Sequence, residues 1–254
     1  MIFFIYQLFI SLILLFSPII VIFRILKKKE DKFRVKEKFC FPSRMRNKGK
    51  LIWFHGSSVG EIISVIPIIR KYEKNRNIKK ILVTSSTLSS SKILEKIKFK
   101  KTTHQFYPID HIFFSSKFLK YWKPDIAIFL ESEIWPSMFK LLRKKNIKLI
   151  LLNGRITKKT FLRWSILKKF SNSVFDSIST AYPQNSETNN FLKKLNVKKV
   201  RSIGNLKFIE DDKSEYNKID KDLFLQFKKY KTFISASTHN LEEIFAVKSH
   251  ILLK

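Results

Sequence analysis

Charged side chains follow the apolar runs in the middle of the sequence. They are Glu61 in WFHGSSVGE (53–61), Glu131 and Glu133 after IAIFL (126–130), Arg155 after LILLN (149–153), and Lys207 after VRSIG (200–204). A carboxylate can accept a proton or stabilise developing positive charge, and an ammonium group can stabilise an anionic leaving group. These residue types therefore predict a site built from carboxylates and lysine.

Each of these residues also has a plainer interpretation. Ser58 and Glu61 fit the S-x-x-E capping box, in which the Glu61 carboxylate would bond back to the Ser58 amide. Glu131 would equally well hydrogen-bond the turn before Ile134, and Lys207 would be one solvated lysine among many. Taken singly, the residues leave both interpretations open.

The elements around these residues alternate between strand and helix. Apolar runs of strand length occupy 51–55, 81–84, 126–130, 149–153, 177–180 and 200–204. Stretches of helical period begin near Glu61, Leu88, Ile134, Lys159 and Ser186. This alternation predicts an α/β fold with a parallel sheet and helices on both faces. Because ligands bind outside the carboxyl ends of the strands in such sheets, the charged residues are expected at the ligand edge.

Several common kinds of site are excluded by the sequence. It contains neither the G-x-G-x-x-G fingerprint of dinucleotide sites nor the G-x-x-x-x-G-K-[ST] phosphate loop, and it has no G-x-S-x-G hydrolase elbow. Cys40 is the only cysteine, which excludes an internal disulfide framework, and no Cys/His cluster has metal-site spacing. We therefore expect no metal and no cofactor.

The composition is strongly basic. The chain of 254 residues carries 51 Lys and Arg against 20 Asp and Glu, a formal charge of +31, and 44% of its residues are hydrophobic. The apolar share is enough for a core, and the charge favours anionic partners such as nucleic acid, lipid phosphates or anionic sugars. A compositional bias of the genome would produce the same skew without any anionic partner.

The first segment is a candidate membrane anchor. From Ile2 to Phe23 no charged residue occurs, a length that matches a bilayer core of ~30 Å, and Arg24 and Lys27–Lys29 follow at once. The segment lacks the basic start and the cleavage site of a secretory signal peptide. Basic residues beside a span stay in the cytoplasm, so the rest of the chain is expected to face the cytoplasm. A buried helix or an in-plane anchor is the alternative, because Pro18 could break the span.

Five motifs follow one another along the chain. They are HGSSVGE (55–61), FLESEIWPSMF (129–139), LLNGRITKKT (151–160), SIGNLKF (202–208) and SASTHNLEE (235–243), preceded by the anchor and the basic DKFRVKEKF (31–39). This order resembles that of 3-deoxy-D-manno-octulosonic acid (Kdo) transferases, and H-x-x-S-V-G-E together with E-S-E-I-W-P is specific to that family. Its members are membrane-associated glycosyltransferases of the GT-B kind, with two Rossmann-like domains, that move Kdo from CMP-Kdo to the lipid A precursor, lipid IVA.

The resemblance implies roles for particular residues of this chain. Glu61 would be the general base that accepts the proton of the acceptor hydroxyl, and Glu131 and Lys207 would be transition-state stabilisers. Substrate binding is implied for Ser58, Gly60, Glu133, Arg155, Asn205, Ser237 and His239. The implied partners are CMP-Kdo, the lipid A precursor and the inner (cytoplasmic) membrane, whose anionic lipids match the basic surface. Nucleic acid is not expected, and the scheme requires no metal.

The implied organisation is incomplete at the carboxyl end. We expect a membrane anchor at 1–26, a basic juxtamembrane segment at 27–50, an acceptor-side Rossmann-like domain at 51–210, and at 211–254 a connector with only the start of a nucleotide-side domain, including a strand at TFISAS (232–237). A lone strand leaves sheet edges unpaired, which predicts a split or truncated transferase that works with a complementary carboxyl-terminal fragment. The alternative is an inactive remnant, or a membrane-anchored basic module that binds anionic lipid or nucleic acid.

Overall fold

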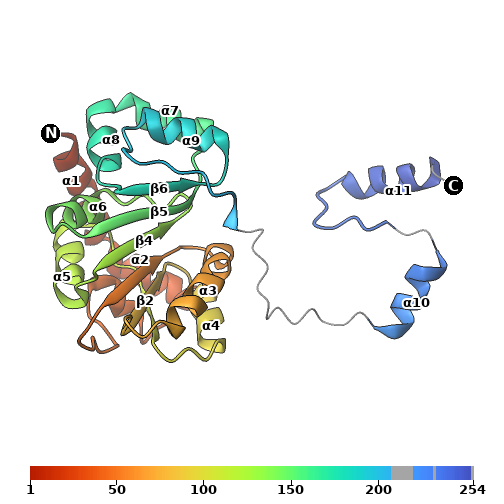
Figure 1. Cartoon of the computed structure of the whole chain (residues 1–254), viewed down its shortest axis with the longest axis horizontal. Coiled ribbons are helices and arrows are strands. Elements are labelled where there is room, and N and C mark those ends of the chain that lie inside the picture. Colours follow the sequence, from red (N-terminus) through yellow and green to blue (C-terminus); the bar gives the residue numbers. More distant parts are fainter. Residues whose placement is uncertain (207–219, 231–232, 253–254) are drawn as a thin grey trace. The chain divides into compact units, whose positions relative to one another are not determined.

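The chain forms two compact units, Met1–Glu210 and Asp211–Lys254. The structure is a computed structural model that describes residues 1–206, 220–230 and 233–252 (Figure 1). Lys207 and the first residue of the predicted strand at 232–237 lie outside the described residues.

The first unit is built on a six-stranded parallel sheet. Its strands are β1 (Leu51–His55), β2 (Lys80–Ser85), β3 (Thr102–Phe106), β4 (Ile126–Leu130), β5 (Lys148–Gly154) and β6 (Thr180–Pro183), in the spatial order β3-β2-β1-β4-β5-β6. The strand order reverses at the neighbours β1 and β4, and ligands of such sheets bind outside the carboxyl ends at that point. The predicted α/β fold with a parallel sheet is confirmed.

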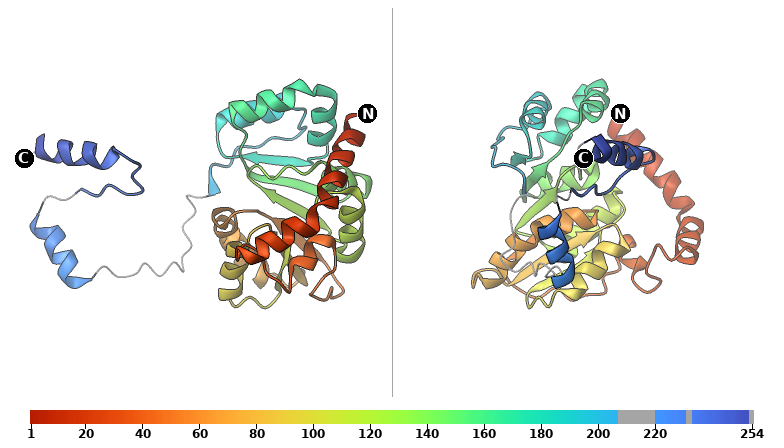
Figure 2. Two further views of the ribbon diagram at one scale, coloured as in Figure 1. Left: turned by 180° about the vertical axis from the view of Figure 1, so that it is seen from behind. Right: turned by 90° about the vertical axis from the view of Figure 1, so that its right-hand side faces the viewer.

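Helices cover both faces of this sheet (Figures 1 and 2). They are α3 (Val59–Lys74), α4 (Leu88–Lys96), α5 (Ile112–Trp122), α6 (Pro136–Lys144), α7 (Lys158–Ile166), α8 (Lys168–Phe175) and α9 (Ser186–Lys194). The side chains of β1 alternate between two cores: Leu51 and Trp53 pack with residues of α5, α6 and α8, whereas Ile52 and Phe54 pack with residues of α3 and α4. A strand buried on both faces needs apolar residues at every position, which LIWFH supplies up to His55.

Two of the strands predicted in the first unit differ from the structure, and one strand was not predicted. β3 was not predicted, because its sequence TTHQF is polar. The predicted strand at 177–180 lies instead at Thr180–Pro183, and the predicted strand at 200–204 is reduced to one bridge between Val200 and Ala181. β6 is therefore the last strand of the sheet in the described part of the chain. The Arg201 amide still donates to the carbonyl of Ala181 in β6 (2.9 Å), but 201–205 form no strand.

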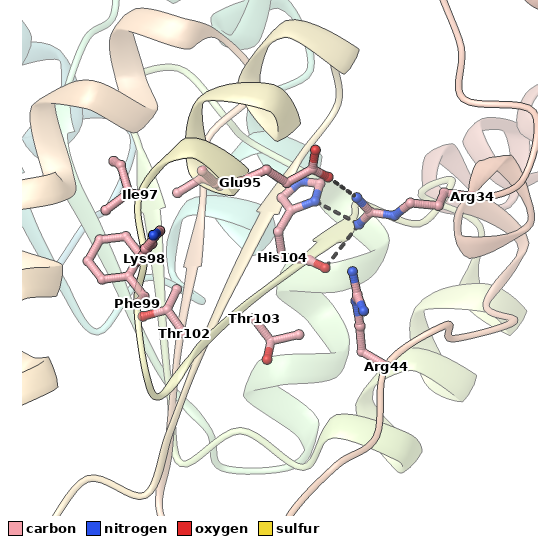
Figure 3. A pocket seen from close by; sticks show the side chains of 10 residues that line it. Arg34, Arg44, Glu95, Ile97, Lys98, Phe99, Thr102, Thr103 and His104 are labelled. Carbon is pink, nitrogen blue, oxygen red and sulfur yellow. Dashed lines mark hydrogen bonds and ion pairs between the residues drawn. The ribbon is translucent and has the colours of Figure 1, made fainter.

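The basic segment before β1 closes the outer edge of β3. Within it lies the short 3₁₀ helix η1 (Val35–Phe39), and the fully buried Glu37 accepts a hydrogen bond from the Phe106 amide (2.8 Å). Arg34 donates to Glu37, to Glu95 and to both Nδ1 and the carbonyl of His104 (Figure 3). Part of the predicted juxtamembrane segment thus covers the edge strand β3, whose backbone groups would otherwise be exposed and unpaired.

The amino-terminal apolar segment forms two helices, α1 (Ile2–Leu15) and α2 (Ser17–Leu26), with a bend of 55° between them. No single helix of the described chain is long and apolar enough to cross a membrane, and this bent pair passes only by combined length and composition. Pro18 stands in the first turn of α2, where its ring is tolerated, so the break falls just before it. Both helices lie along the outside of the first unit (Figure 2).

The second unit contains the helices α10 (Lys221–Lys229) and α11 (Glu242–Leu252). The strand predicted at 232–237 is wrong for its described residues: 233–237 adopt no strand. A strand requires a hydrogen-bonded neighbour, and the described residues of this unit offer none. Asp220 caps α10 by accepting hydrogen bonds from the amides of Asp222 and Leu223.

Candidate functional site

The carboxyl end of β1 delivers Glu61 to the edge of the sheet. After His55 the chain leaves the strand, and Gly56 N–H still donates to the carbonyl of Thr84 in the neighbouring β2 (3.1 Å). Ser58 has an extended backbone and is the N-cap of α3, so Glu61 stands in the first turn of that helix. The side chain is buried, with a residue exposure of 8%.

Gly56 leaves the space that Glu61 and Leu130 occupy. A Cβ at Gly56 would lie 2.9 Å from Leu130 Cδ1, 3.1 Å from Glu61 Cβ and 3.2 Å from Glu61 Oε2. These separations are shorter than ordinary van der Waals contact, so a larger residue would push α3 away from β4. In contrast, a Cβ at Gly60 would meet no atom within 4 Å, which leaves open space in front of the first turn of α3.

Glu61 caps its own helix, in a modified form of the predicted capping box. Its Oε2 accepts from the Ser57 amide (2.8 Å) and its Oε1 from the Ser58 hydroxyl (2.9 Å), while the Glu61 amide donates to Ser58 Oγ (3.3 Å). The carboxylate thus reaches the amide of Ser57 rather than that of Ser58. Each carboxylate oxygen has about two acceptor positions, so room remains for a further donor.

Glu131 is held at the same edge by its backbone. It follows β4 directly and has a left-handed backbone, with φ 49°. Its amide donates to the carbonyl of Leu152 (3.0 Å) and its carbonyl accepts from the amide of Arg155 (3.1 Å), so the neighbouring β5 fixes the turn. A left-handed backbone is costly for a residue with a Cβ and is maintained only where its surroundings fix it.

Glu133 takes part in a buried network that the sequence analysis did not identify. Its Oε2 lies 3.1 Å from His55 Nε2 and accepts from Trp135 Nε1 (2.8 Å). His55 Nδ1 lies 3.0 Å from Thr84 Oγ1, and its ring stacks on Tyr107 at 3.8 Å between centroids. His55 and Trp135 belong to the motifs HGSSVGE and ESEIWP, but their contact with a common carboxylate 78 residues from His55 follows only from the adjacency of β1 and β4.

The three glutamates influence one another electrostatically. Burial raises the pKa of Glu61, the negative charges of Glu133 and Glu131 raise it further, and the hydrogen bonds from Ser58 and Ser57 oppose the rise. Burial alone would also raise the pKa of Glu133, but the hydrogen bond and the charge of His55, together with hydrogen bonds from Ser57 and Trp135, outweigh burial and lower that pKa. Glu133 is thereby held as an anion, and Glu61 becomes the more basic of the two carboxylates.

The structure brings most of the predicted site residues to one edge of the first unit. Ser58, Gly60 and Glu61 follow β1, Glu131 and Glu133 follow β4, and Arg155 follows β5. Arg155 is exposed. Asn205 is partly buried next to Leu206, whose amide donates to Asn153 Oδ1 (3.2 Å).

Two other predicted residues belong to the second unit. Ser237 has a left-handed backbone, and His239 Nδ1 lies 3.6 Å from the carboxylate of Glu242. His239 N–H donates to that same carboxylate (2.8 Å), so His239 precedes α11 in a local turn. The roles of these residues, and of every other site residue, remain predictions.

The cavity beside Arg34 is a separate feature. Its volume is about 440 Å³, and it is lined by Arg44, Lys98 and Thr102 among others (Figure 3). Thr102 pairs with Ile81 near the start of β2, whereas the glutamates follow the carboxyl ends of their strands. The cavity is therefore at the opposite end of the sheet from Glu61.

Comparison with known proteins identifies the family. A sequence profile of the family described as 3-Deoxy-D-manno-octulosonic-acid transferase (kdotransferase) matches residues 33–210. The chain belongs to this family. A 3-deoxy-D-manno-octulosonic acid transferase of Rickettsia bellii (strain RML369-C) is 35% identical over 240 residues, which are 92% of this chain and 56% of that protein.

More distant relatives share the same description. A probable mitochondrial 3-deoxy-D-manno-octulosonic acid transferase of Arabidopsis thaliana is 30% identical over 98% of this chain and 58% of its own length. A transferase of Haemophilus influenzae is 26% identical over 94% of this chain and 58% of its own. This Kdo transferase family member thus spans slightly more than half the length of these relatives. A solved UDP-GlcNAc 2-epimerase from Neisseria meningitidis aligns with a TM-score of only 0.44, at 14% identity over 63% of this chain and 47% of its own.

Proposed function

We propose that this chain is the acceptor-side part of a glycosyltransferase of lipopolysaccharide biosynthesis, which transfers Kdo from CMP-Kdo to the lipid A precursor, lipid IVA. Glu61 is the general base. The observation that carries this proposal is the buried Glu61 carboxylate, whose pKa is raised beside Glu131 and Glu133 at the switch point of the sheet. Membership of the Kdo transferase family supports the identity of the transferred sugar.

The proposed step is a displacement at the anomeric carbon of Kdo. The acceptor hydroxyl oxygen forms a bond to that carbon while the bond from the carbon to the phosphate oxygen of CMP breaks, and the bonding electrons leave with CMP. The hydroxyl proton passes to Glu61. Glu131 stabilises the positive charge that develops on the sugar ring, and Lys207, supported by the family motif, stabilises the departing phosphate or the Kdo carboxylate.

We also propose that the protein works at the cytoplasmic face of the inner membrane. The exposed Lys27, Lys28 and Lys29 directly after α2 support this location, because juxtamembrane cations contribute about 1 kcal/mol each near an anionic bilayer. The nucleotide-side part is proposed to come from further residues of the same protein or from a complementary fragment.

The test uses this chain fused to the carboxyl-terminal part of the Rickettsia bellii relative, and it measures Kdo transfer from CMP-Kdo to lipid IVA. Glu61→Gln keeps one acceptor oxygen, which can serve the Ser57 amide, and its NH2 group can donate to the Ser58 hydroxyl. It cannot take up the proton, so the rate should fall by ~10² to 10⁴. Glu187→Gln is the matched control, because Glu187 is an exposed first-turn glutamate of α9, and it should leave the rate unchanged. Turnover of Glu61→Gln within a few-fold of the parent would reduce Glu61 to a helix cap.

A further inference from the structure

Helix α1 turns polar side chains toward the rest of the first unit, at the starts of α5 and α6. Tyr6 Oη donates to Asp110 Oδ2 (2.8 Å). Gln7 Nε2 donates to Ser137 Oγ (2.7 Å), and Gln7 Oε1 accepts from the amide of Ile112 (2.8 Å). These three hydrogen bonds fasten α1 to the starts of α5 and α6 over sequence separations of more than 100 residues.

The outward side of α1 is an apolar stripe. Six side chains, here called the outer stripe, are each more than half exposed: Phe4, Ile5, Leu8, Phe9, Leu12 and Leu15. Their spacing follows helical periodicity, and α2 continues the apolar surface with Ile19, Ile22 and Phe23. A surface helix of a water-soluble domain has the reverse arrangement, with its apolar stripe toward the core.

Basic side chains lie at the margins of the apolar surface formed by α1 and α2. Lys27, Lys28 and Lys29 are exposed at the end of α2, and Lys140 lies 3.9 Å from the ring centroid of Phe3 beside the docked face. An apolar helix face flanked by cations is complementary to an anionic bilayer, in which the apolar side chains enter the acyl boundary and the cations meet the headgroups. A protein partner would not require this combination.

We propose that α1 and α2 lie in the plane of an anionic bilayer while Tyr6 and Gln7 dock α1 on the sheet-and-helix body of the first unit, with the outer stripe inserted into the lipid. The helices then do not cross the membrane. Their lengths, about 21 Å and about 15 Å at 1.5 Å per residue, suit an in-plane pair joined by a bend.

The docked helices α1 and α2 are coupled to the connection between β4 and α6, which carries Glu131 and Glu133. This inference rests on the proposed function. Asp110 also accepts hydrogen bonds from the amides of Ser137 (2.9 Å) and Met138 (2.9 Å) and so caps α6. Burial raises the pKa of Asp110 to about 6, so at neutral pH it is mainly an anion that binds Tyr6 and both amides. Glu133 lies four residues before Ser137, in the connection between β4 and α6. The anchor therefore holds this connection next to the membrane surface, where a lipid acceptor is presented.

Labelling from one side of the membrane tests the topology. The full chain is expressed in a bacterial host, inside-out inner-membrane vesicles are prepared, and a membrane-impermeant maleimide is added to Ile2→Cys and Lys28→Cys separately. The in-plane arrangement predicts that both variants react in intact vesicles, with less than a twofold gain on adding detergent. If Ile2→Cys reacts only after detergent is added, α1 and α2 span the membrane and the proposal is wrong. The parent chain is the control, since its native Cys40 is buried with a pKa raised to about 12 by burial and should not react.

A second measurement tests docking. Fluorophores on Leu8→Cys, on Phe113→Cys and on Lys74→Cys are exposed to quenchers placed at the headgroup boundary of phosphatidylcholine and phosphatidylglycerol vesicles. Phe113 is an exposed residue of α5 next to the docked helix, whereas Lys74 ends α3 on the other face of the sheet. We expect strong quenching at Leu8 and Phe113 and little at Lys74.

The docking bonds are then removed. Tyr6→Phe with Gln7→Ala should leave quenching at Leu8 unchanged but at least halve it at Phe113, because the domain is no longer held against the helix. Equal quenching at Phe113 with and without these substitutions would overturn the docking role. Neither measurement uses sugar transfer, so failure of the in-plane anchor and failure of the proposed transferase activity are separate results.

Discussion

Two glycines of HGSSVGE stand in opposite surroundings, so alanine should change stability in opposite directions at the two positions. At Gly56 a Cβ would lie 2.9 Å from Leu130 Cδ1 and 3.1 Å from Glu61 Cβ. Leu130 is fully buried, and the Glu61 Cβ is fixed at the start of α3, so neither can move without disturbing packed structure. At Gly60 the same atom would enter open space.

The expected magnitudes follow from these distances. Overpacking of a filled interior costs ~1–3 kcal/mol, which applies to Gly56→Ala. Gly60 is in the first turn of α3, and replacing a helical glycine by alanine stabilises by ~0.4–1 kcal/mol because the unfolded chain loses freedom. For a unit of this size, 1 kcal/mol corresponds to a change of ~2–4 °C in Tm.

Urea unfolding followed by tryptophan fluorescence measures both effects. Trp53, Trp122, Trp135 and Trp164 all belong to the first unit, so the signal reports on that unit. Gly56→Ala should lower the urea midpoint and Gly60→Ala should raise it slightly. If Gly56→Ala unfolds at the midpoint of the parent, the close approach of Gly56 to Glu61 and Leu130 does not constrain the site, and the reasoning fails.

Three further predictions concern charge. Glu133→Gln removes a negative charge that raises the pKa of Glu61, so the rise of kcat/KM with pH in the fusion protein should move to lower pH, and an unmoved profile would contradict the coupling. Glu37→Gln deprives the largely buried Arg34 of its main counter-charge and should cost about 3 kcal/mol of unfolding free energy, whereas an unchanged midpoint would make the pair dispensable. Cys40 should resist iodoacetamide at neutral pH until urea unfolds the chain, and rapid native alkylation would show that its burial is wrong.

The sheet could be predicted wherever a strand is apolar, and β3 shows why the prediction was incomplete. Three of its four polar side chains find partners after folding: Thr102 donates to Glu73 (2.6 Å), His104 lies 2.9 Å from Ser85 Oγ, and Gln105 accepts from Trp122 (2.9 Å). Such partners come from distant positions in the sequence. The local pattern of hydrophobic residues therefore does not predict that TTHQF is a strand.

The strand predictions at 200–204 and, among the described residues, at 233–237 were wrong for the opposite reason. Their residue types favour strands, but a strand exists only where a neighbouring backbone is available for pairing. Val200 pairs with Ala181 of β6 in a single bridge, and 233–237 have no strand beside them in the described part of the second unit. Propensity alone could not distinguish these runs from β1 or β4.

The two interpretations of Glu61, helix cap and general base, describe one geometry rather than competing ones. The bonds from Ser57 and Ser58 fix the carboxylate and lower its pKa, while burial and the charges of Glu131 and Glu133 raise it, and the rise prevails. A base that is well oriented but too strongly hydrogen-bonded would accept a proton poorly, and a buried base without caps would lack orientation. The sequence showed the caps through S-x-x-E, but the opposing charges become apparent only when β1 and β4 are placed side by side. Under the proposed mechanism, the adjacency of these two strands is what turns a capping residue into a base.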